Sequence, residues 1–120
     1  MLTSFPAAIT SLPLTTFAVS ENKEMKGSFT EFFYSCPTLS ALEVASTQLS
    51  GSLPSNIGSL VPNLSFLDIS ESLATGSIPA SITSLSNMTA LTIGQLASFE
   101  VVIPEDIGRL GNLGKYHLLC

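Results

Sequence analysis

The sequence has 120 residues, of which 45% are hydrophobic and 11% are charged, and its formal net charge at pH 7 is −5. Between Thr38 and Phe99 there is no lysine, arginine or histidine. The basic side chains that neutralise nucleic-acid phosphates or anionic lipid headgroups are therefore missing from the middle of the chain. No window is apolar over the length of a membrane span. We therefore expect a chain that binds no nucleic acid and does not itself insert into a membrane.

Apolar residues recur along the chain with one period. Leucine-type anchors are spaced by 25, 25, 24 and 25 residues, at Leu14, Leu39, Leu64, Met88 and Leu113. Each of the first four anchors is followed by two alternating apolar residues: Phe17 and Val19, Leu42 and Val44, Leu67 and Ile69, and Leu91 and Ile93. Alternation of this kind predicts one short β-strand with a buried face in each repeat. A fifth strand begins in the same phase at Tyr116.

The second half of each repeat carries a proline-containing pattern. The segment GSLPSNIGSL at residues 51–60 returns as GSIPASITSL at residues 76–85. Related copies lie at residues 5–12 and 103–110, and a copy without proline begins at Phe29. Apolar residues three positions apart, after a proline at the first position, predict a turn of 3₁₀ or α-helix.

A repeat of this length with L-x-x-L-x-L spacing is the signature of leucine-rich repeats. The added G-x-(L/I)-P stretch makes the chain resemble the plant-specific subclass of that family over about residues 4–119. The resemblance implies an α/β repeat solenoid, with one short parallel β-strand per repeat on the concave side and 3₁₀ or helical turns on the convex side. We divide the array into full repeats at 14–38, 39–63, 64–87 and 88–112, with partial repeats at 1–13 and 113–120.

The ends of the chain allow two interpretations. Residues 1–20 are apolar and rich in Ser and Thr, as a secretory signal is, but they lack a positively charged start and contain Pro6 and Pro13. We favour a partial repeat over a signal peptide there. Neither end carries a polar capping repeat, so we expect the chain to be a fragment of a longer array.

The ninth position of the repeat departs from the family pattern. The family usually has Asn there, whose amide satisfies backbone groups at the bend after the strand. Here the position holds Asn22, Thr47, Ser72 and Leu96. We expect Thr47 and Ser72 to make a shorter version of these bonds, which Leu96 cannot make. The repeat from Met88 also has an extra residue, so we expect it to be distorted between residues 95 and 102.

The outward-facing strand positions form the candidate binding surface. Because the anchors are buried, the residues between them face outward and align in columns across the sheet. The candidates for ligand binding are Glu43, Phe66, Asp68, Ser70, Glu71 and Thr92. They are small, polar or acidic, with one aromatic anchor. A surface of this kind suits a protein or peptide ligand that carries basic or hydroxyl-bearing groups.

The sequence carries no catalytic constellation. His117 is the only histidine, and Glu105-Asp106 fits polar filler on a convex turn better than an acid–base pair. Cys36 occupies a leucine position of the repeat and Cys120 is the last residue, so they form no metal-binding or redox motif. We therefore expect no enzymatic activity, no cofactor and no metal.

Two N-glycosylation sequons begin at Asn63 and Asn87, at the same repeat position. The chain also resembles kinetoplastid leucine-rich repeat surface antigens, whose repeats contain the same sequence motif as residues 46–54, STQLSGSLP. Together with the resemblance to ectodomains of plant receptor-like proteins and kinases, this implies recognition of a protein or peptide outside the cell or at its surface. Two alternatives stay open: the sensor part of a receptor kinase, and a structural or adhesive coat protein.

Overall fold

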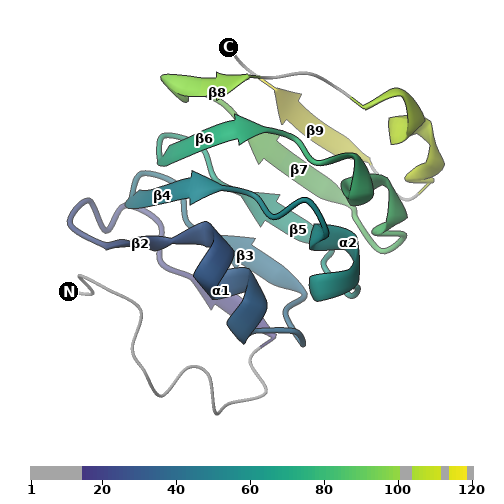
Figure 1. Ribbon diagram of the computed structural model, residues 1–120, viewed down its shortest axis with the longest axis horizontal. Helices are drawn as coiled ribbons and strands as arrows, with labels where there is room; N and C mark the ends of the chain where they lie inside the picture. The colour runs from purple at the N-terminus through teal and green to yellow at the C-terminus, as the bar shows by residue number, and fades with distance from the viewer. Residues whose placement is uncertain (1–14, 101–103, 112–113, 119–120) are drawn as a thin grey trace.

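The computed structural model describes residues 15–100, 104–111 and 114–118. Within them, a main parallel β-sheet, a second parallel sheet and a row of helical turns wind around one apolar core (Figure 1). The anchors Leu14 and Leu113, the partial repeat at 1–13, and Cys120 lie outside the described residues.

The main sheet contains the strands that the alternating apolar residues predict. Its strands are parallel and follow the order of the repeats: β1 (Thr16–Ala18), β3 (Ala41–Glu43), β5 (Phe66–Asp68), β7 (Ala90–Ile93) and β9 (Lys115–Leu118). The buried central residues pair directly across the sheet, in the order Phe17, Leu42, Leu67 and Leu91. Their neighbours along each strand are exposed or half-buried. The predicted strand of each repeat is confirmed for this part of the chain.

A second sheet was not predicted. Its parallel strands are β2 (Lys26–Ser28), β4 (Gln48–Ser52), β6 (Leu73–Ser77) and β8 (Ser98–Glu100). Gly51 and Gly76 lie inside β4 and β6 with φ of 88° and 82°, a backbone conformation that glycine adopts without strain. The distortion expected after Gln95 is not seen as far as Glu100, the last described residue before 104. There β8 pairs in register with β6, with Glu100 opposite Ser77.

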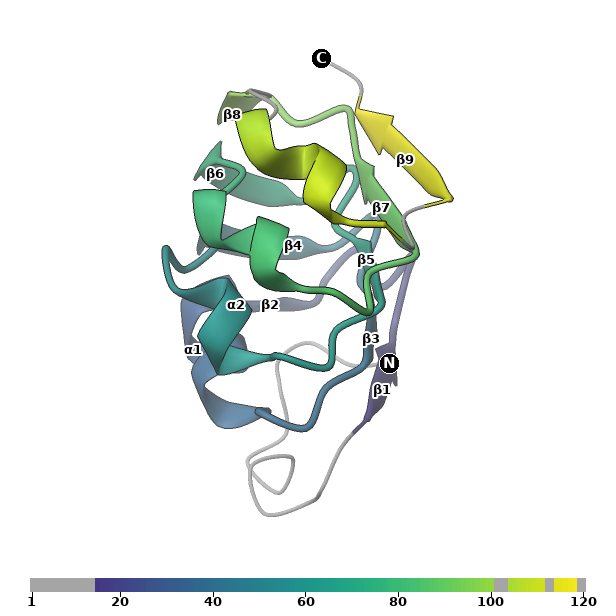
Figure 2. The same cartoon turned by 90° about the vertical axis from the view of Figure 1, so that its right-hand side faces the viewer.

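Helical turns complete each coil of the chain. They are α1 (Phe29–Ser35), α2 (Ile57–Leu60), η2 (Ala80–Ser84) and η3 (Glu105–Arg109). Pro79 and Pro104 directly precede the two 3₁₀ turns, as the proline pattern predicts. The copy without proline forms the longer helix α1, where the Ser28 hydroxyl accepts the Glu31 N–H. Figure 2 shows these turns stacked beside one another, away from the main sheet.

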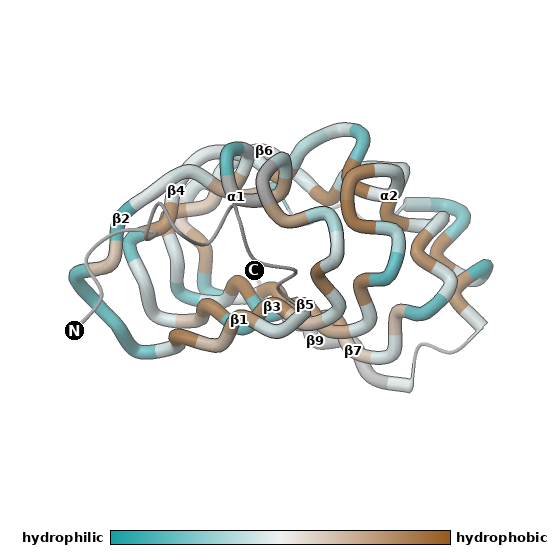
Figure 3. The backbone as a smooth tube through the Cα atoms, turned by 90° about the horizontal axis from the view of Figure 1, so that it is seen from below, coloured by the Kyte–Doolittle hydropathy of each residue, from teal (hydrophilic) through white to brown (hydrophobic). Residues whose placement is uncertain are grey.

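One apolar core lies between the sheets and the helical turns. The anchors Leu39, Leu64 and Met88 are fully buried, and Cys36 is 2% exposed at a leucine position of the repeat. Viewed along the stack, the main sheet and the second sheet lie on opposite sides of the coil (Figure 3). The main sheet therefore has one face against the core and one face available to a partner.

The bend after β1, β3 and β5 is held by the ninth residue of the repeat. Its side chain donates to the carbonyl three residues earlier: Asn22 Nδ2 to Val19 (2.7 Å), Thr47 Oγ1 to Val44 (2.9 Å) and Ser72 Oγ to Ile69 (2.7 Å). The Thr47 and Ser72 hydroxyls are buried and also accept a backbone N–H two residues later. The shorter version of the asparagine bond is therefore confirmed, and Leu96 fills the equivalent place as a buried apolar side chain.

Candidate binding surface

The outer face of the main sheet carries the predicted columns. Strand pairing aligns Thr16, Ala41, Phe66 and Ala90 in one column and Ala18, Glu43, Asp68 and Thr92 in the next. Glu43 is exposed, while Asp68 and Thr92 are half-buried. Phe66, expected to be an exposed aromatic, is half-buried as well. The face is therefore formed mainly by small and polar side chains on a hydrogen-bonded backbone.

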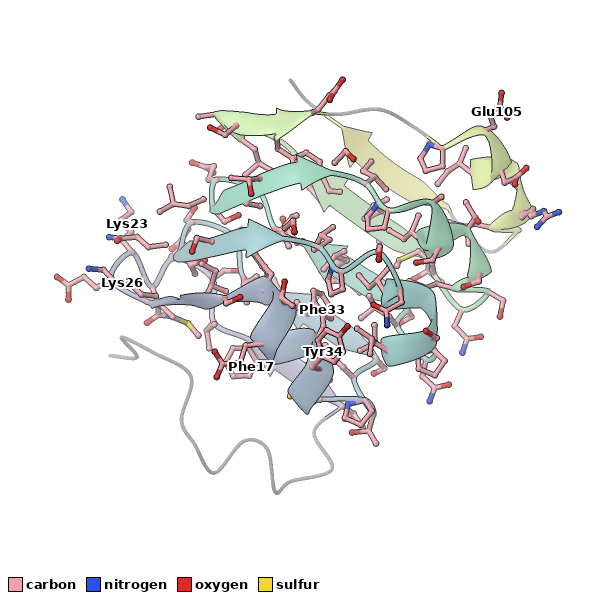
Figure 4. The ribbon with its side chains drawn as sticks, viewed as in Figure 1. Phe17, Lys23, Lys26, Phe33, Tyr34 and Glu105 are labelled. Carbon is pink, nitrogen blue, oxygen red and sulfur yellow. The ribbon has the colours of Figure 1, made fainter. Side chains whose placement is uncertain are left out.

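Two carboxylates lie side by side on this face. Glu43 and Asp68 are register partners on β3 and β5, whose backbones are about 4.8 Å apart in a parallel sheet. Among the described side chains neither carboxylate forms an ion pair. Of the lysine side chains that the structure describes, Lys23 lies in the turn before β2 and Lys26 is the first residue of β2 (Figure 4). Adjacent like charges on a sheet repel each other and attract a cationic partner.

The residues just after β5 shape the end of the face. The Ser70 N–H donates to the Asp68 carboxylate at 3.1 Å, which holds that carboxylate in place. The Ser70 hydroxyl oxygen is covered from solvent and has no hydrogen-bond partner among the described residues. Glu71 is exposed and has a positive φ of 54°, a conformation shared with Glu21, Ser46 and Gln95 at the same repeat position. The candidate residues 66, 68, 70 and 71 thus lie along β5 and the bend after it and are half-buried or exposed, with the Ser70 hydroxyl itself covered.

A groove lies where the chain turns from the main sheet to the second sheet. Its volume is about 280 Å³, and its lining comes from successive repeats: Lys23, then Ser46, Thr47 and Gln48, then Glu71 and Leu73. Leu73, at the start of β6, is 55% exposed despite being apolar. Sequence reasoning missed this residue because it belongs to the unpredicted second sheet. Leu73 pairs with Ser50, which is exposed on the outward side of that sheet. A leucine at such an outward position is the signal that could have revealed it.

Solved structures with a similar arrangement of strands and turns are known. No protein-family model matches the sequence, and no curated protein matches it either. The chain is similar over 99% of its length to the plant peptide hormone receptor RGFR1, solved in complex with RGF2, with a TM-score of 0.78 and 28% identity. It is similar over 97% of its length to the leucine-rich repeat ectodomain of the receptor kinase SOBIR1 from Arabidopsis thaliana, with a TM-score of 0.81 and 25% identity.

The fold is a leucine-rich repeat solenoid. A third similar structure is that of the BIR3–SERK2 complex from Arabidopsis thaliana, matched over 78% of this chain with a TM-score of 0.67 and 32% identity. The chain spans 19% of the RGFR1 chain, 62% of the SOBIR1 chain and 50% of the third matched chain. It therefore corresponds to part of the array in each of these proteins.

The residues considered for catalysis, Cys36, Glu105-Asp106 and His117, lie on or next to different elements, α1, η3 and β9. Within those residues, His, Cys, Asp and Glu side chains do not gather in groups of three that could hold a metal ion. Burial raises the pKa of the Cys36 thiol, so the nucleophilic thiolate is disfavoured there. Glu105 and Asp106 are exposed on η3. None of the described helices is long and apolar enough to span a bilayer.

Both sequons lie on accessible turns of the solenoid. Asn63 and Asn87 are exposed, each in the turn between a helical segment and the next main strand. Hydroxyls of both sequons bond backbone carbonyls of the preceding repeat: Ser65 Oγ donates to Ser40 at 3.0 Å and Thr89 Oγ1 to Ser65 at 3.0 Å. The asparagine residues themselves are exposed to solvent.

Proposed function

We propose that this solenoid is a non-catalytic module that binds a protein or peptide on the outer face of its main sheet. The observation that carries the proposal is the pair of aligned columns on that face. In them Glu43 and Asp68 lie next to each other without a cationic partner among the described side chains. A rigid surface that presents unpaired carboxylates beside Phe66 attracts a ligand with basic groups and gives it an apolar contact.

The similar structures support a protein or peptide partner. RGFR1 is a peptide hormone receptor solved with RGF2, and BIR3 is solved in a complex with SERK2. We extend that kind of partner, and no specific ligand, to this chain. SOBIR1 is a receptor kinase, so the sensor part of such a kinase is the second candidate function.

The proposed site of action is outside the cell or at its surface. The support is the exposure of Asn63 and Asn87, together with the similarity to receptor ectodomains. When the chain is secreted from a eukaryotic cell, we expect a mobility shift that a glycosidase removes. The shift should be absent from the double variant Asn63→Gln/Asn87→Gln. An unshifted wild-type band after secretion would contradict glycosylation at both sites.

Ligand binding is tested by selection of peptides from a random dodecamer display library on the whole chain. We expect peptides with Lys or Arg to be enriched, and Glu43→Lys/Asp68→Lys to abolish their binding. The matched control is Glu105→Lys/Asp106→Lys, which makes the same charge change on η3 and should leave binding intact. The circular dichroism melt of each variant verifies its fold. Equal loss of binding in both double variants would show a net-charge effect and contradict a site on the main sheet.

A further inference from the structure

The groove beside the main sheet contains a large apolar side chain that is exposed to solvent. Tyr34 and Leu73 are the large apolar residues that are exposed in the described part of the chain, at 57% and 55%. Tyr34 lies on α1, and its hydroxyl donates to Asn56 Oδ1 at 3.5 Å, so its polar end has a partner (Figure 4). Leu73 has no polar end and lines a hollow. An aliphatic group of a partner that covers it would remove apolar surface from water.

The groove also has opposite charges on its two sides. Lys23 comes from the repeat before the groove floor, and Glu71 comes from the repeat after it. Both side chains are exposed, and neither forms an ion pair among the described residues. Among the lining residues Lys23 can pair with a carboxylate of a partner, and Glu71 repels it; the exposed Glu21 and Glu24 flank Lys23 in the chain but do not line the groove. Since Leu73 is two residues from Glu71, the partner's aliphatic group and its carboxylate must lie at opposite ends of the groove.

The floor of the groove is held by hydrogen bonds. Gln48 Nε2 donates to the Lys23 carbonyl at 2.7 Å, and the buried Thr47 hydroxyl donates to the Val44 carbonyl at 2.9 Å. The Glu71 N–H donates to the Gly94 carbonyl at 3.0 Å on the far side. A groove whose walls are fixed in this way needs little reordering when a ligand enters it.

The spacing of the repeats sets the length of the ligand. Adjacent repeats are about 4.8 Å apart, so the backbones that carry Lys23 and Leu73 are separated by roughly 10 Å. In an extended peptide, side chains two residues apart lie on one face at about 6.7 Å. The flexible lysine side chain spans the difference. An acidic residue and an aliphatic residue separated by one position therefore match the two ends.

We infer that this groove binds an extended peptide segment with an acidic residue and an aliphatic residue two positions apart. The aliphatic side chain covers Leu73, the carboxylate pairs with Lys23, and Glu71 accepts a backbone N–H of the peptide. The inference rests on the proposed function. Ser46 and Glu71 connect the two sites, because they line the groove and lie three residues after Glu43 and Asp68, the last residues of β3 and β5.

The test uses the same dodecamer selection, carried out on the wild-type chain and on groove variants. We expect wild-type selections to be enriched in Asp or Glu two positions from Leu, Ile or Val. Leu73→Ser should weaken binding of those peptides about five- to tenfold, because it removes roughly half of a leucine burial. Lys23→Glu should replace the acidic residue by Lys or Arg in the selected sequences.

Two controls match the changes outside the groove. Tyr34→Ser removes the other exposed large apolar side chain, and Lys26→Glu reverses a neighbouring exposed lysine that does not line the groove. Both should keep the wild-type motif and bind within about twofold of wild type. The inference is overturned when peptides selected on wild type bind Leu73→Ser as well as they bind wild type, or when Tyr34→Ser weakens them equally.

The remaining outcomes separate the two proposals. A selection in which every enriched peptide depends on Glu43 and Asp68, and none depends on Leu73 or Lys23, overturns the groove and leaves the main-sheet site standing. A wild-type selection without any enriched peptide overturns both. Size-exclusion chromatography gives the last outcome. A concentration-dependent dimer that Leu73→Ser abolishes would show that a second copy of the chain occupies the groove, which also overturns a peptide ligand.

Discussion

The middle repeats, residues 39–87, and the repeat that begins at Met88 hold the same bend in different ways. In the middle repeats the buried hydroxyls of Thr47 and Ser72 bridge backbone groups on both sides of the bend. In the later repeat Leu96 occupies that position as a buried apolar side chain, 8% exposed. Both bends nevertheless have the same positive φ one residue earlier, 54° at Glu71 and at Gln95. The two bends therefore follow the same backbone path, but the side-chain hydrogen bonds to that backbone differ between the repeats.

The helical side shows a second difference between the same two regions. Gly58 on α2 packs against η2, where its N–H donates to Ser81 Oγ at 3.2 Å. A Cβ atom at Gly58 would overlap the Ser84 hydroxyl and the Ser81 carbonyl oxygen. Gly108 has the same place in the pattern, but a Cβ there meets no described atom within 4 Å. Gly58 is thus a packing requirement because the next helical turn, η2, lies against it, whereas η3 is the last helical turn that the structure describes.

The largest expected effect tests whether the two regions share one core. Leu67 and Leu91 are both fully buried and directly paired across the main sheet. Leu67→Asp and Leu91→Asp should each abolish folding of the whole chain, because an unpaired charge would enter the core. The circular dichroism melt measures this. Asp68→Ala, on the outer face, should leave the melt nearly unchanged. Loss of only part of the helical and sheet signal in one variant would show that the regions fold separately.

The next effect concerns the two glycines. Gly58→Ala should destabilise the chain by about 2–3 kcal/mol, because the overlap is partly with backbone that cannot rotate away. Gly108→Ala should change the free energy of unfolding by less than about 0.5 kcal/mol. Urea denaturation of the two variants measures the difference. Equal effects of the two substitutions would contradict the close packing of α2 against η2.

The sequence predicted the main sheet and its columns because each strand has its own apolar alternation, from Phe17 to Ile93. The family resemblance also predicted the bonds of Thr47 and Ser72, because the family has an asparagine at that position whose amide bonds the backbone. The sequence did not predict the second sheet, whose strands contain glycine and serine and owe their pairing to the neighbouring repeats. It also did not predict the exposure of Leu73, because Leu73 lies on a strand of this second sheet. The sequence of a single repeat also does not predict the packing between repeats, such as the contact of Gly58 with Ser81 and Ser84.

The bend itself gives an intermediate effect. Thr47→Val keeps the volume but leaves the Val44 carbonyl and the Leu49 N–H without their side-chain partner, which should cost about 1–3 kcal/mol. Ser72→Ala should have a similar cost for the same reason. Leu96→Asn is the informative counterpart. We expect it to cost less than the about 2–5 kcal/mol of an ordinary leucine truncation, because an amide there can bond the backbone as Asn22 does.

Urea midpoints of these variants decide between the two kinds of bend. A large loss of stability in Leu96→Asn, equal to that of Leu96→Ala, would show that the later repeat needs an apolar residue. Near-neutral behaviour of Thr47→Val would show that the hydroxyl bonds of the middle repeats contribute little. Either result would remove the distinction drawn between the two regions.

The smallest expected effect depends on pH and involves the inward position that Cys36 shares with Leu85 and Leu110. Burial raises the pKa of the Cys36 thiol above its ordinary value of 9.0, while the thiol of the unfolded chain ionises near that value. The thiol's contribution to stability is therefore complete below pH 9 and is lost as the pH rises toward the raised pKa of the folded chain. Urea midpoints at pH 7 and pH 10 should fall further for wild type than for Cys36→Ala. Because the two proteins differ only at residue 36, the difference between the two falls isolates the thiol. Parallel falls would mean that solvent reaches Cys36, and that this position in the first repeat is less tightly closed than its leucine counterparts in the later ones.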